Sequence, residues 1–100
     1  MKKSTLLLVL VFLLTLGTVT AQRKITGTVS SAQDNKPAAG VTVSVKGTTI
    51  GTFADENGRY EIMVPEKYKT LVFAFVGLKT LEVAIGASNE INVSMQPDVL

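Results

Sequence analysis

From residue 22 onward, the sequence alternates between apolar and polar side chains in short runs, and this period of two restricts the fold more than any other feature. In segment 41–46, Val41, Val43 and Val45 fall on one face and polar side chains on the other, and segment 59–64 repeats the pattern. Because a β-strand places successive side chains on opposite faces, each such segment is predicted to be a strand with one buried face. No segment after the first 21 residues has the period of a helix.

Turn-forming residues separate these runs. Glycine falls between most of the strand candidates, and segment 30–40 is a polar loop that contains Asp34, Asn35 and Pro37. Short strands spaced about 8–12 residues apart, with turn signals between them, favour an antiparallel sandwich or a small barrel. We predict seven strands, at about residues 23–30, 41–46, 49–54, 59–64, 69–76, 79–85 and 90–96.

Residues 71–76 differ from the other runs because every side chain in them is apolar. A continuous apolar run of this length fits a strand that is covered on both faces or placed centrally in its sheet. Among the aromatic residues, Tyr60, Phe73 and Phe75 fall on faces predicted to be buried, so we expect them to be packing residues. The position of Phe53 stays open, because the strand predicted around it is short.

The first 21 residues have the pattern of a secretory signal peptide. Lys2 and Lys3 form a basic start, residues 6–14 are apolar without a break, and residues 19–21 supply the small side chains of a cleavage site. The apolar run is shorter than the ~20 residues that span a membrane, and the order basic, apolar, small is typical of export. We expect cleavage after Ala21.

Cleavage there would leave a chain without net side-chain charge. Lys2 and Lys3 leave with the signal peptide, so the ten basic residues become eight, equal to the eight acidic ones. Nothing in this balance favours binding to nucleic acid or to an anionic membrane surface. We expect one small domain at residues 22–96 without a transmembrane segment, followed by the start of a linker at 97–100.

The residue types that are missing exclude several kinds of chemistry. The sequence contains no histidine and no cysteine. Ordinary zinc sites, Ser-His-Asp triads and Cys-His pairs all need one or both of these residues. Disulfide bonds are excluded for the same reason.

The stretch FADENGRY at residues 53–60 raises the question of a metal or acid–base site. A calcium loop of EF-hand type starting at Asp55 would need glycine at its sixth position, whereas Gly58 falls at the fourth. Glycoside hydrolysis requires two carboxyl groups facing each other across a cleft, and Asp55 and Glu56 are neighbours in sequence. A turn explains the stretch better: Asp55 caps it, and Asn57 and Gly58 tolerate the positive φ that closes a hairpin.

The other polar candidates give weak signals. The triplet Asn92-Val93-Ser94 matches a glycosylation sequon, but the alternation places it within a strand. The pairs Arg23-Lys24 and Lys67 with Lys69 are typical of solvated faces. We therefore expect no catalytic, cofactor-binding or metal-binding residue, and no enzyme activity.

Taken in order, the motifs of residues 24–96 resemble a known family. They read ITGTV at 25–29, KPAAGVTV at 36–43, VKGTT at 45–49, GTFADENGRY at 51–60, LVFAFVG at 71–77 and INVSM at 91–95. This order, behind a signal peptide, is similar to the carboxypeptidase-regulatory-like, transthyretin-type domain at the N-terminus of SusC/RagA-type TonB-dependent outer-membrane transporters.

The resemblance implies an all-β fold, a seven-stranded antiparallel Greek-key β-sandwich exported to the periplasmic side of the outer membrane. In that family the domain precedes a TonB box, a plug and a barrel that imports nutrients. The domain itself is non-catalytic and has no cofactor. Its implied partners are periplasmic or outer-membrane proteins of a nutrient-uptake system.

Two features depart from the family pattern. Leu78 stands where the family usually has an aromatic residue, and the sequence ends at Leu100, before any TonB box, plug or barrel. We expect either a fragment of such a transporter or a free-standing copy of its accessory domain. The alternative is a periplasmic or surface sandwich that binds a protein partner or a glycan through loops 30–40 and 65–69.

Overall fold

The computed structural model describes residues 21–98, and this part of the chain is all-β, without a helix. Its strands are β1 (Gln22–Ser31), β2 (Thr42–Val45), β3 (Gly51–Phe53), β4 (Arg59–Pro65), β5 (Thr70–Ala74), β6 (Leu81–Ala84) and β7 (Val93–Met95). The predicted signal peptide, apart from its last residue, and the end of the predicted linker lie outside the described residues.

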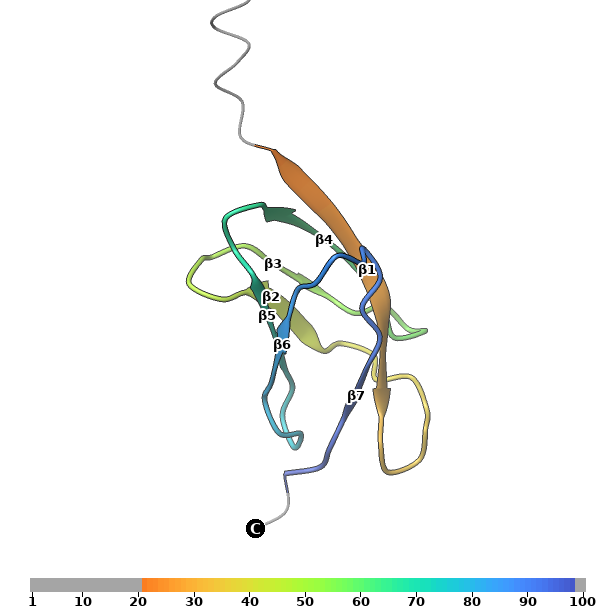
Figure 1. Cartoon of the computed structure of the whole chain (residues 1–100). Coiled ribbons are helices and arrows are strands. Elements are labelled where there is room, and N and C mark those ends of the chain that lie inside the picture. Colours follow the sequence, from red (N-terminus) through yellow and green to blue (C-terminus); the bar gives the residue numbers. More distant parts are fainter. Residues whose placement is uncertain (1–20, 99–100) are drawn as a thin grey trace, which may run out of the picture.

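The strands form two sheets that pack face to face as a sandwich (Figure 1). One sheet has the order β4-β1-β7, and the other has the order β3-β2-β5-β6. The seven-stranded sandwich predicted from the sequence is confirmed. The strand ends differ by a few residues, since the strand predicted at 69–76 ends at Ala74 and the one predicted at 90–96 is reduced to Val93–Met95.

One strand pair is parallel, whereas the strands were predicted to be antiparallel. β1 and β7 are parallel, with Val29 opposite Val93 and Ser31 opposite Met95, whereas the other strand pairs are antiparallel. Parallel neighbours need a long connection between them, and here almost the whole domain supplies it. Alternation within a segment carries no information about its direction, which is why the sequence did not reveal this pair.

The apolar run at residues 71–76 is only partly a strand. β5 lies in the middle of its sheet, between β2 and β6, as predicted, and it buries Leu71 and Phe73. The prediction that Phe75 is buried is wrong: its side chain is 46% exposed, and that of Val76 is 93% exposed. The strand ends at Ala74, and a turn closed by the Leu78 N–H and the Phe75 carbonyl begins, so the alternation no longer determines which side chain faces the core.

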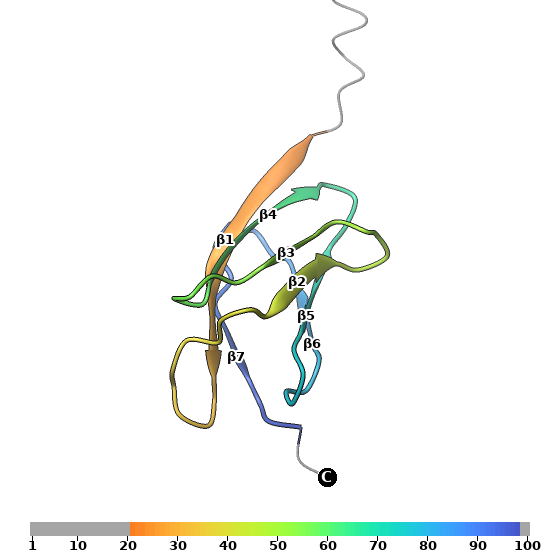
Figure 2. The ribbon, with the colours of Figure 1, turned by 180° about the vertical axis from the view of Figure 1, so that it is seen from behind.

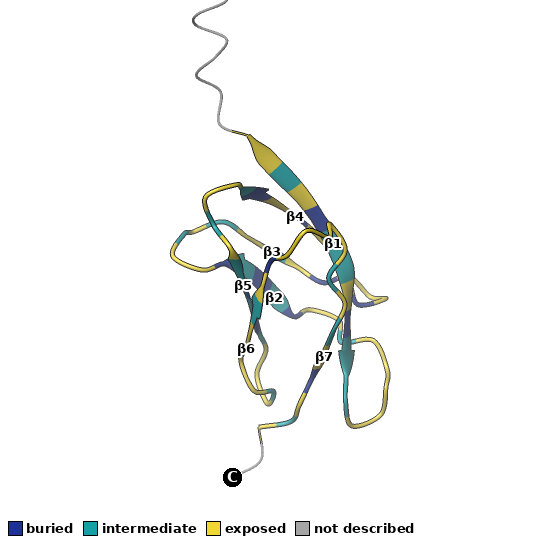
Figure 3. Ribbon diagram, in the orientation of Figure 1, coloured by how far each residue is buried: buried dark blue, intermediate teal, exposed yellow. Residues whose placement is uncertain are grey.

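The hydrophobic core fills the space between the two sheets (Figure 3). Its buried residues are Ile25, Val29, Val41, Val43, Val45, Ala54, Tyr60, Ile62, Val64, Leu71, Phe73, Ile85 and Met95. The rings of Tyr60 and Phe73 meet edge to face across the sandwich, with centroids 5.4 Å apart. Each fully buried large side chain stabilises the fold by about 1.5–3 kcal/mol, so these contacts carry most of the stability of a domain that has no disulfide bond.

The two ends of the described chain lie at opposite ends of the sandwich. β1 enters at the upper end in Figure 1, and the chain leaves β7 at the lower end; Figure 2 shows the same arrangement from behind. After β7, the chain stays attached to the turn between β5 and β6. The N–H of Lys79 donates to the carbonyl oxygen of Gln96, and the N–H of Asp98 donates to that of Gly77, both at 2.9 Å.

Candidate functional site

The turn at residues 55–59 is built around one carboxylate. Oδ1 of Asp55 accepts hydrogen bonds from the N–H groups of Asn57 and Arg59, each at 2.9 Å, and the Gly58 N–H donates to the Asp55 carbonyl oxygen. Asp55 therefore caps the turn, as the sequence indicated. The turn does not close a hairpin, because β3 and β4 belong to different sheets. It carries the chain from one layer of the sandwich to the other.

Gly58 supplies both the conformation and the space that this turn needs. Its φ is +74°, while Asn57 does not adopt positive φ. A Cβ at position 58 would lie 2.4 Å from the carbonyl oxygen of Val29. The turn thus packs directly on β1, and the Val29 N–H donates to the Gly58 carbonyl oxygen at 2.7 Å.

A polar hollow of about 520 Å³ lies over the sheet β4-β1-β7, next to this turn. It is lined by Thr26, Gly27, Thr28, Asp55, Arg59, Tyr60, Glu61, Glu90 and Asn92. Its acids have partners: Glu61 pairs with Lys24 at 3.1 Å, Glu90 accepts from the Asn92 amide at 3.0 Å, and Asp55 caps the turn. Within residues 21–98, no three acidic side chains gather to hold a metal ion. The acidic side chains that line the hollow thus already have hydrogen-bonding or ionic partners within the domain.

Tyr60 is among the residues that line this hollow, and its side chain is buried in the core. Its hydroxyl donates a 2.6 Å hydrogen bond to the carbonyl oxygen of Ile91, in the segment that leads into β7. Burial raises the pKa of the Tyr60 phenol to about 12. The group therefore stays protonated at physiological pH and acts as a structural donor.

Gly27 makes room for the Tyr60 contact. A Cβ at position 27 would lie 1.9 Å from the Ile91 carbonyl oxygen and 2.9 Å from the Tyr60 hydroxyl. No such role was predicted for Gly27 from the sequence. A glycine inside a strand can mark a site where another backbone approaches closely, and that signal would have found it.

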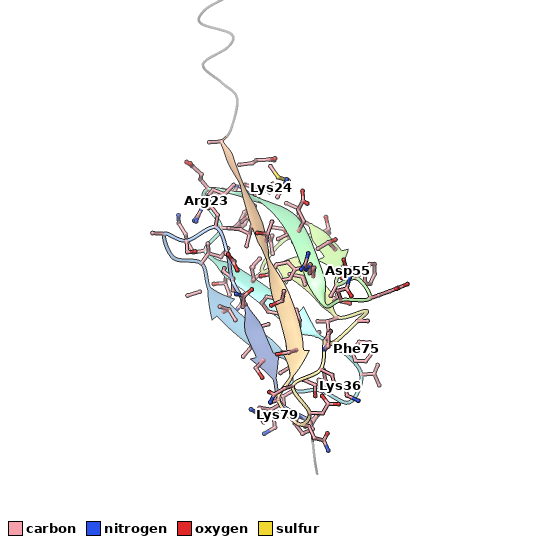
Figure 4. All side chains as sticks on the ribbon, turned by 90° about the vertical axis from the view of Figure 1, so that its right-hand side faces the viewer. Arg23, Lys24, Lys36, Asp55, Phe75 and Lys79 are labelled. Carbon is pink, nitrogen blue, oxygen red and sulfur yellow. The ribbon has the colours of Figure 1, made fainter. Side chains whose placement is uncertain are left out.

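The remaining polar candidates have structural roles. The Asn92 side chain, part of the sequon, accepts from the Thr28 N–H at 2.9 Å and from the Thr28 hydroxyl at 3.1 Å. Arg23, expected to be merely solvated, donates to the Ser88 carbonyl oxygen and to the Asn89 side chain. The ammonium group of Lys67 lies 5.1 Å from the centre of the Tyr68 ring. Figure 4 shows Arg23 and Asp55 at separate places along the sandwich, so the structure does not bring these candidates together.

Of the large apolar side chains that are exposed in the described residues, Phe53, Phe75 and Val76 lie on or next to the other sheet, whereas Met63 lies on β4. A second hollow of about 500 Å³ is lined by Gly40, Thr42, Ala74, Phe75, Val76 and Thr80. Phe53 is 70% exposed and lies opposite Thr42 in the strand register. The residues that line this hollow are mainly apolar, with two threonines and no titratable side chain among them.

Sequence comparisons relate the chain to one family. A model of the CarboxypepD_reg-like domain matches residues 25–99. TonB-dependent receptor P3 from Formosa agariphila is 43% identical over 89 residues, which cover 87% of this chain and 9% of the receptor. TonB-dependent receptor P39 from the same organism is 33% identical over 85 residues, which cover 85% of this chain and 8% of that receptor. The chain thus spans less than a tenth of the length of these relatives.

Two structural findings complete the comparison. A chain in the crystal structure of a type II cohesin–X-dockerin complex from Acetivibrio cellulolyticus superposes with a TM-score of 0.53 at 22% identity, covering 72% of this chain and 51% of that one. At this identity the likeness shows the fold alone, a β-sandwich. Among the described residues, no helix has the length and hydrophobicity needed to cross a membrane. The chain belongs to the CarboxypepD_reg-like domain family and matches the N-terminal region of TonB-dependent receptors.

Proposed function

We propose that this chain is the non-catalytic accessory domain of a TonB-dependent nutrient transporter of SusC/RagA type, exported behind residues 1–21 and placed on the periplasmic side of the outer membrane. The observation that carries the proposal is the 43% identity to a TonB-dependent receptor across 87% of the chain. Identity at this level extends over both layers of the sandwich, so it covers the whole domain rather than a single motif.

The side chains support a non-catalytic role. CarboxypepD_reg-like domains of TonB-dependent receptors are non-catalytic. The carboxylate of Asp55 is occupied by two backbone N–H groups, and Glu61 is paired with Lys24 at the surface. Catalytic acids and bases instead need a free group within reach of a bound substrate.

The size of the cellular polypeptide tests the attachment to a transporter. An antiserum raised against the chain should detect, in outer-membrane fractions of the source cells, a polypeptide close in length to the receptors, of which this chain spans 9% or less. A band below the 10.6 kDa of the whole sequence, as expected after removal of residues 1–21, in the periplasmic fraction would support a free-standing module instead. Reading the coding frame beyond the codon for Leu100 gives an independent check.

Cysteine labelling tests the location. Because residues 1–100 contain no cysteine, a Gln33→Cys substitution in the exposed loop after β1 introduces the one thiol of this domain, and the unsubstituted protein serves as the control for labelling elsewhere. A maleimide that cannot cross the outer membrane should label this residue only after the membrane has been permeabilised. Labelling of intact cells would place the domain on the cell surface and contradict the proposal.

The alternative function is a free-standing module that binds a protein or a glycan through loops 30–40 and 65–69. Glycan binding commonly needs an exposed aromatic ring, and Tyr68 is the aromatic residue in these loops. Its ring is partly buried against the core and lies beside the Lys67 ammonium group. This placement favours a protein partner over a glycan, and a glycan array with the purified chain separates the two.

A further inference from the structure

The first and last strands of this domain lie side by side and point in the same direction. β1 begins at one end of the sandwich, and the chain leaves β7 at the other (Figures 1 and 2). The segment before β7 also follows β1, since Thr26 and Glu90 form a parallel bridge. A force that pulls the two ends of the chain apart therefore draws these neighbouring segments past each other along their length.

A row of hydrogen bonds resists this sliding. The Thr26 N–H donates to the Asn89 carbonyl oxygen, the Ile91 N–H donates to the Thr26 carbonyl oxygen, and the Ala32 N–H donates to the Met95 carbonyl oxygen, each at 2.9 Å. The paired residues of β1 and β7, from Val29 with Val93 to Ser31 with Met95, lie between these bonds along β1. Bonds between strands run across the strand direction, so sliding loads all of them together, whereas peeling breaks them one after another.

Side-chain hydrogen bonds add to the contact between β1 and the segment that leads into β7. The Asn92 amide oxygen accepts from both the N–H and the hydroxyl of Thr28, and so replaces a backbone partner where the ladder is interrupted. Arg23, near the start of β1, holds Asn89 with two hydrogen bonds, at 2.9 and 3.1 Å. The Tyr60 hydroxyl holds the same segment from the β4 side.

We propose that β1 and the segment at residues 87–95 form a mechanical clamp, by which the domain stays folded under tension applied along the chain through its two ends. The proposal rests on the direction of two strands and on the bonds between them, and it does not depend on the proposed function.

The direction of pulling tests the clamp on the unaltered fold. Residues 22–100 are placed between marker domains of known unfolding force and pulled from their two ends in an atomic-force microscope. In a second arrangement, the force is applied between a thiol introduced by Gln33→Cys, in the loop just after β1, and the C-terminus. Both attachment points of that arrangement lie at the same end of the parallel pair, so β7 is peeled from β1.

We expect the unfolding force to be at least about twofold higher when the chain is pulled from its two ends, because several bonds must then break at once. Equal forces in the two arrangements would overturn the proposal.

A matched pair of variants tests the residues. Asn92→Ala removes an acceptor of two hydrogen bonds inside the clamp, and Asp55→Ala removes an acceptor of two hydrogen bonds outside it. End-to-end pulling should give a lower unfolding force for Asn92→Ala than for Asp55→Ala, even where thermal melting shows similar losses. If Asp55→Ala lowers the force as much as Asn92→Ala does, the force reports overall stability and the clamp is refuted. If either variant fails to fold, the comparison of pulling directions on the unaltered chain still decides.

Discussion

The phenolic oxygen of Tyr60 lies 2.6 Å from the carbonyl oxygen of Ile91, and the two residues are 31 positions apart in sequence. This bond joins β4 to the segment that leads into β7, and it passes over β1 at Gly27, where a side chain would collide with the Ile91 carbonyl oxygen. One hydroxyl and one missing side chain thus bring three segments of the same layer together.

Alkaline pH should destabilise the domain through Tyr60. Below about pH 10 the phenol is protonated in both the folded and the unfolded chain, so its contribution to stability is constant. Between pH 10 and 12 the unfolded chain releases the proton while the folded chain, with its raised pKa of about 12, retains it. The free energy of unfolding should therefore fall over this range, by roughly 2–3 kcal/mol at most. Urea titrations at pH 8, 10 and 11.5 measure the change.

Tyr60→Phe is the control for that experiment. It removes the titrating group while keeping the ring that packs against Phe73. The variant should be less stable than the parent at pH 8 by about 1–3 kcal/mol, because the Ile91 carbonyl oxygen loses its donor. It should also lose part of the alkaline sensitivity. An identical pH dependence in parent and variant would assign the effect to other groups.

Gly27→Ala should disrupt the approach of the segment at 90–92 to β1. The new Cβ would lie 1.9 Å from the Ile91 carbonyl oxygen, so the backbone must move. We expect a loss of about 1–3 kcal/mol or more, with faster amide hydrogen exchange at Ile91. Gly86→Ala is the matched control, since no atom lies within 4 Å of its added Cβ, and it should change stability by less than about 0.5 kcal/mol. Similar melting temperatures for the two variants would contradict the close contact.

Gly58→Ala and Gly47→Ala separate conformational strain from steric overlap. Both positions have positive φ, +74° and +83°, so both variants should lose about 1 kcal/mol from backbone strain. Only the Cβ at position 58 meets another atom, the Val29 carbonyl oxygen at 2.4 Å, while position 47 is open. Thermal unfolding should therefore show a clearly larger loss for Gly58→Ala. Equal losses would mean that the 55–59 turn moves away from β1 without cost.

Phe73→Ala should leave the domain largely unfolded. The ring is completely buried, and its removal costs about 3–5 kcal/mol, close to the total stability of a small domain, which starts at about 5 kcal/mol. Phe75→Ala, two residues further along, removes a ring that is 46% exposed and should cost less than about 1 kcal/mol. Circular dichroism and denaturant titration of the two variants measure the contrast. A melting temperature unaffected by Phe73→Ala would show that the ring does not belong to the core.

The contrast between Phe73 and Phe75 shows that alternation predicts the burial of a side chain only within a strand. Both rings have the same phase in the alternation, but the phase holds only while the strand continues, and β5 ends at Ala74. In the same way, residues 53–60 carry the signals of a turn, and the structure confirms the capping by Asp55. Which strands that turn connects depends on the sheets around it, so the expectation of a hairpin was wrong.

The local elements of this protein could be predicted from its residues alone: seven two-faced strands, the glycines in the turns between them, and the lack of the residue types needed for zinc or triad chemistry. These properties follow from the period of the side chains and from residue identity, which act over a few neighbours along the chain. The parallel pairing of β1 with β7, the role of Gly27 and the hydrogen bonds from Arg23 to Asn89 emerge only from the packing of the folded domain. These contacts join residues more than 60 positions apart, and no local pattern encodes a contact whose partner is chosen by the packing of the whole domain.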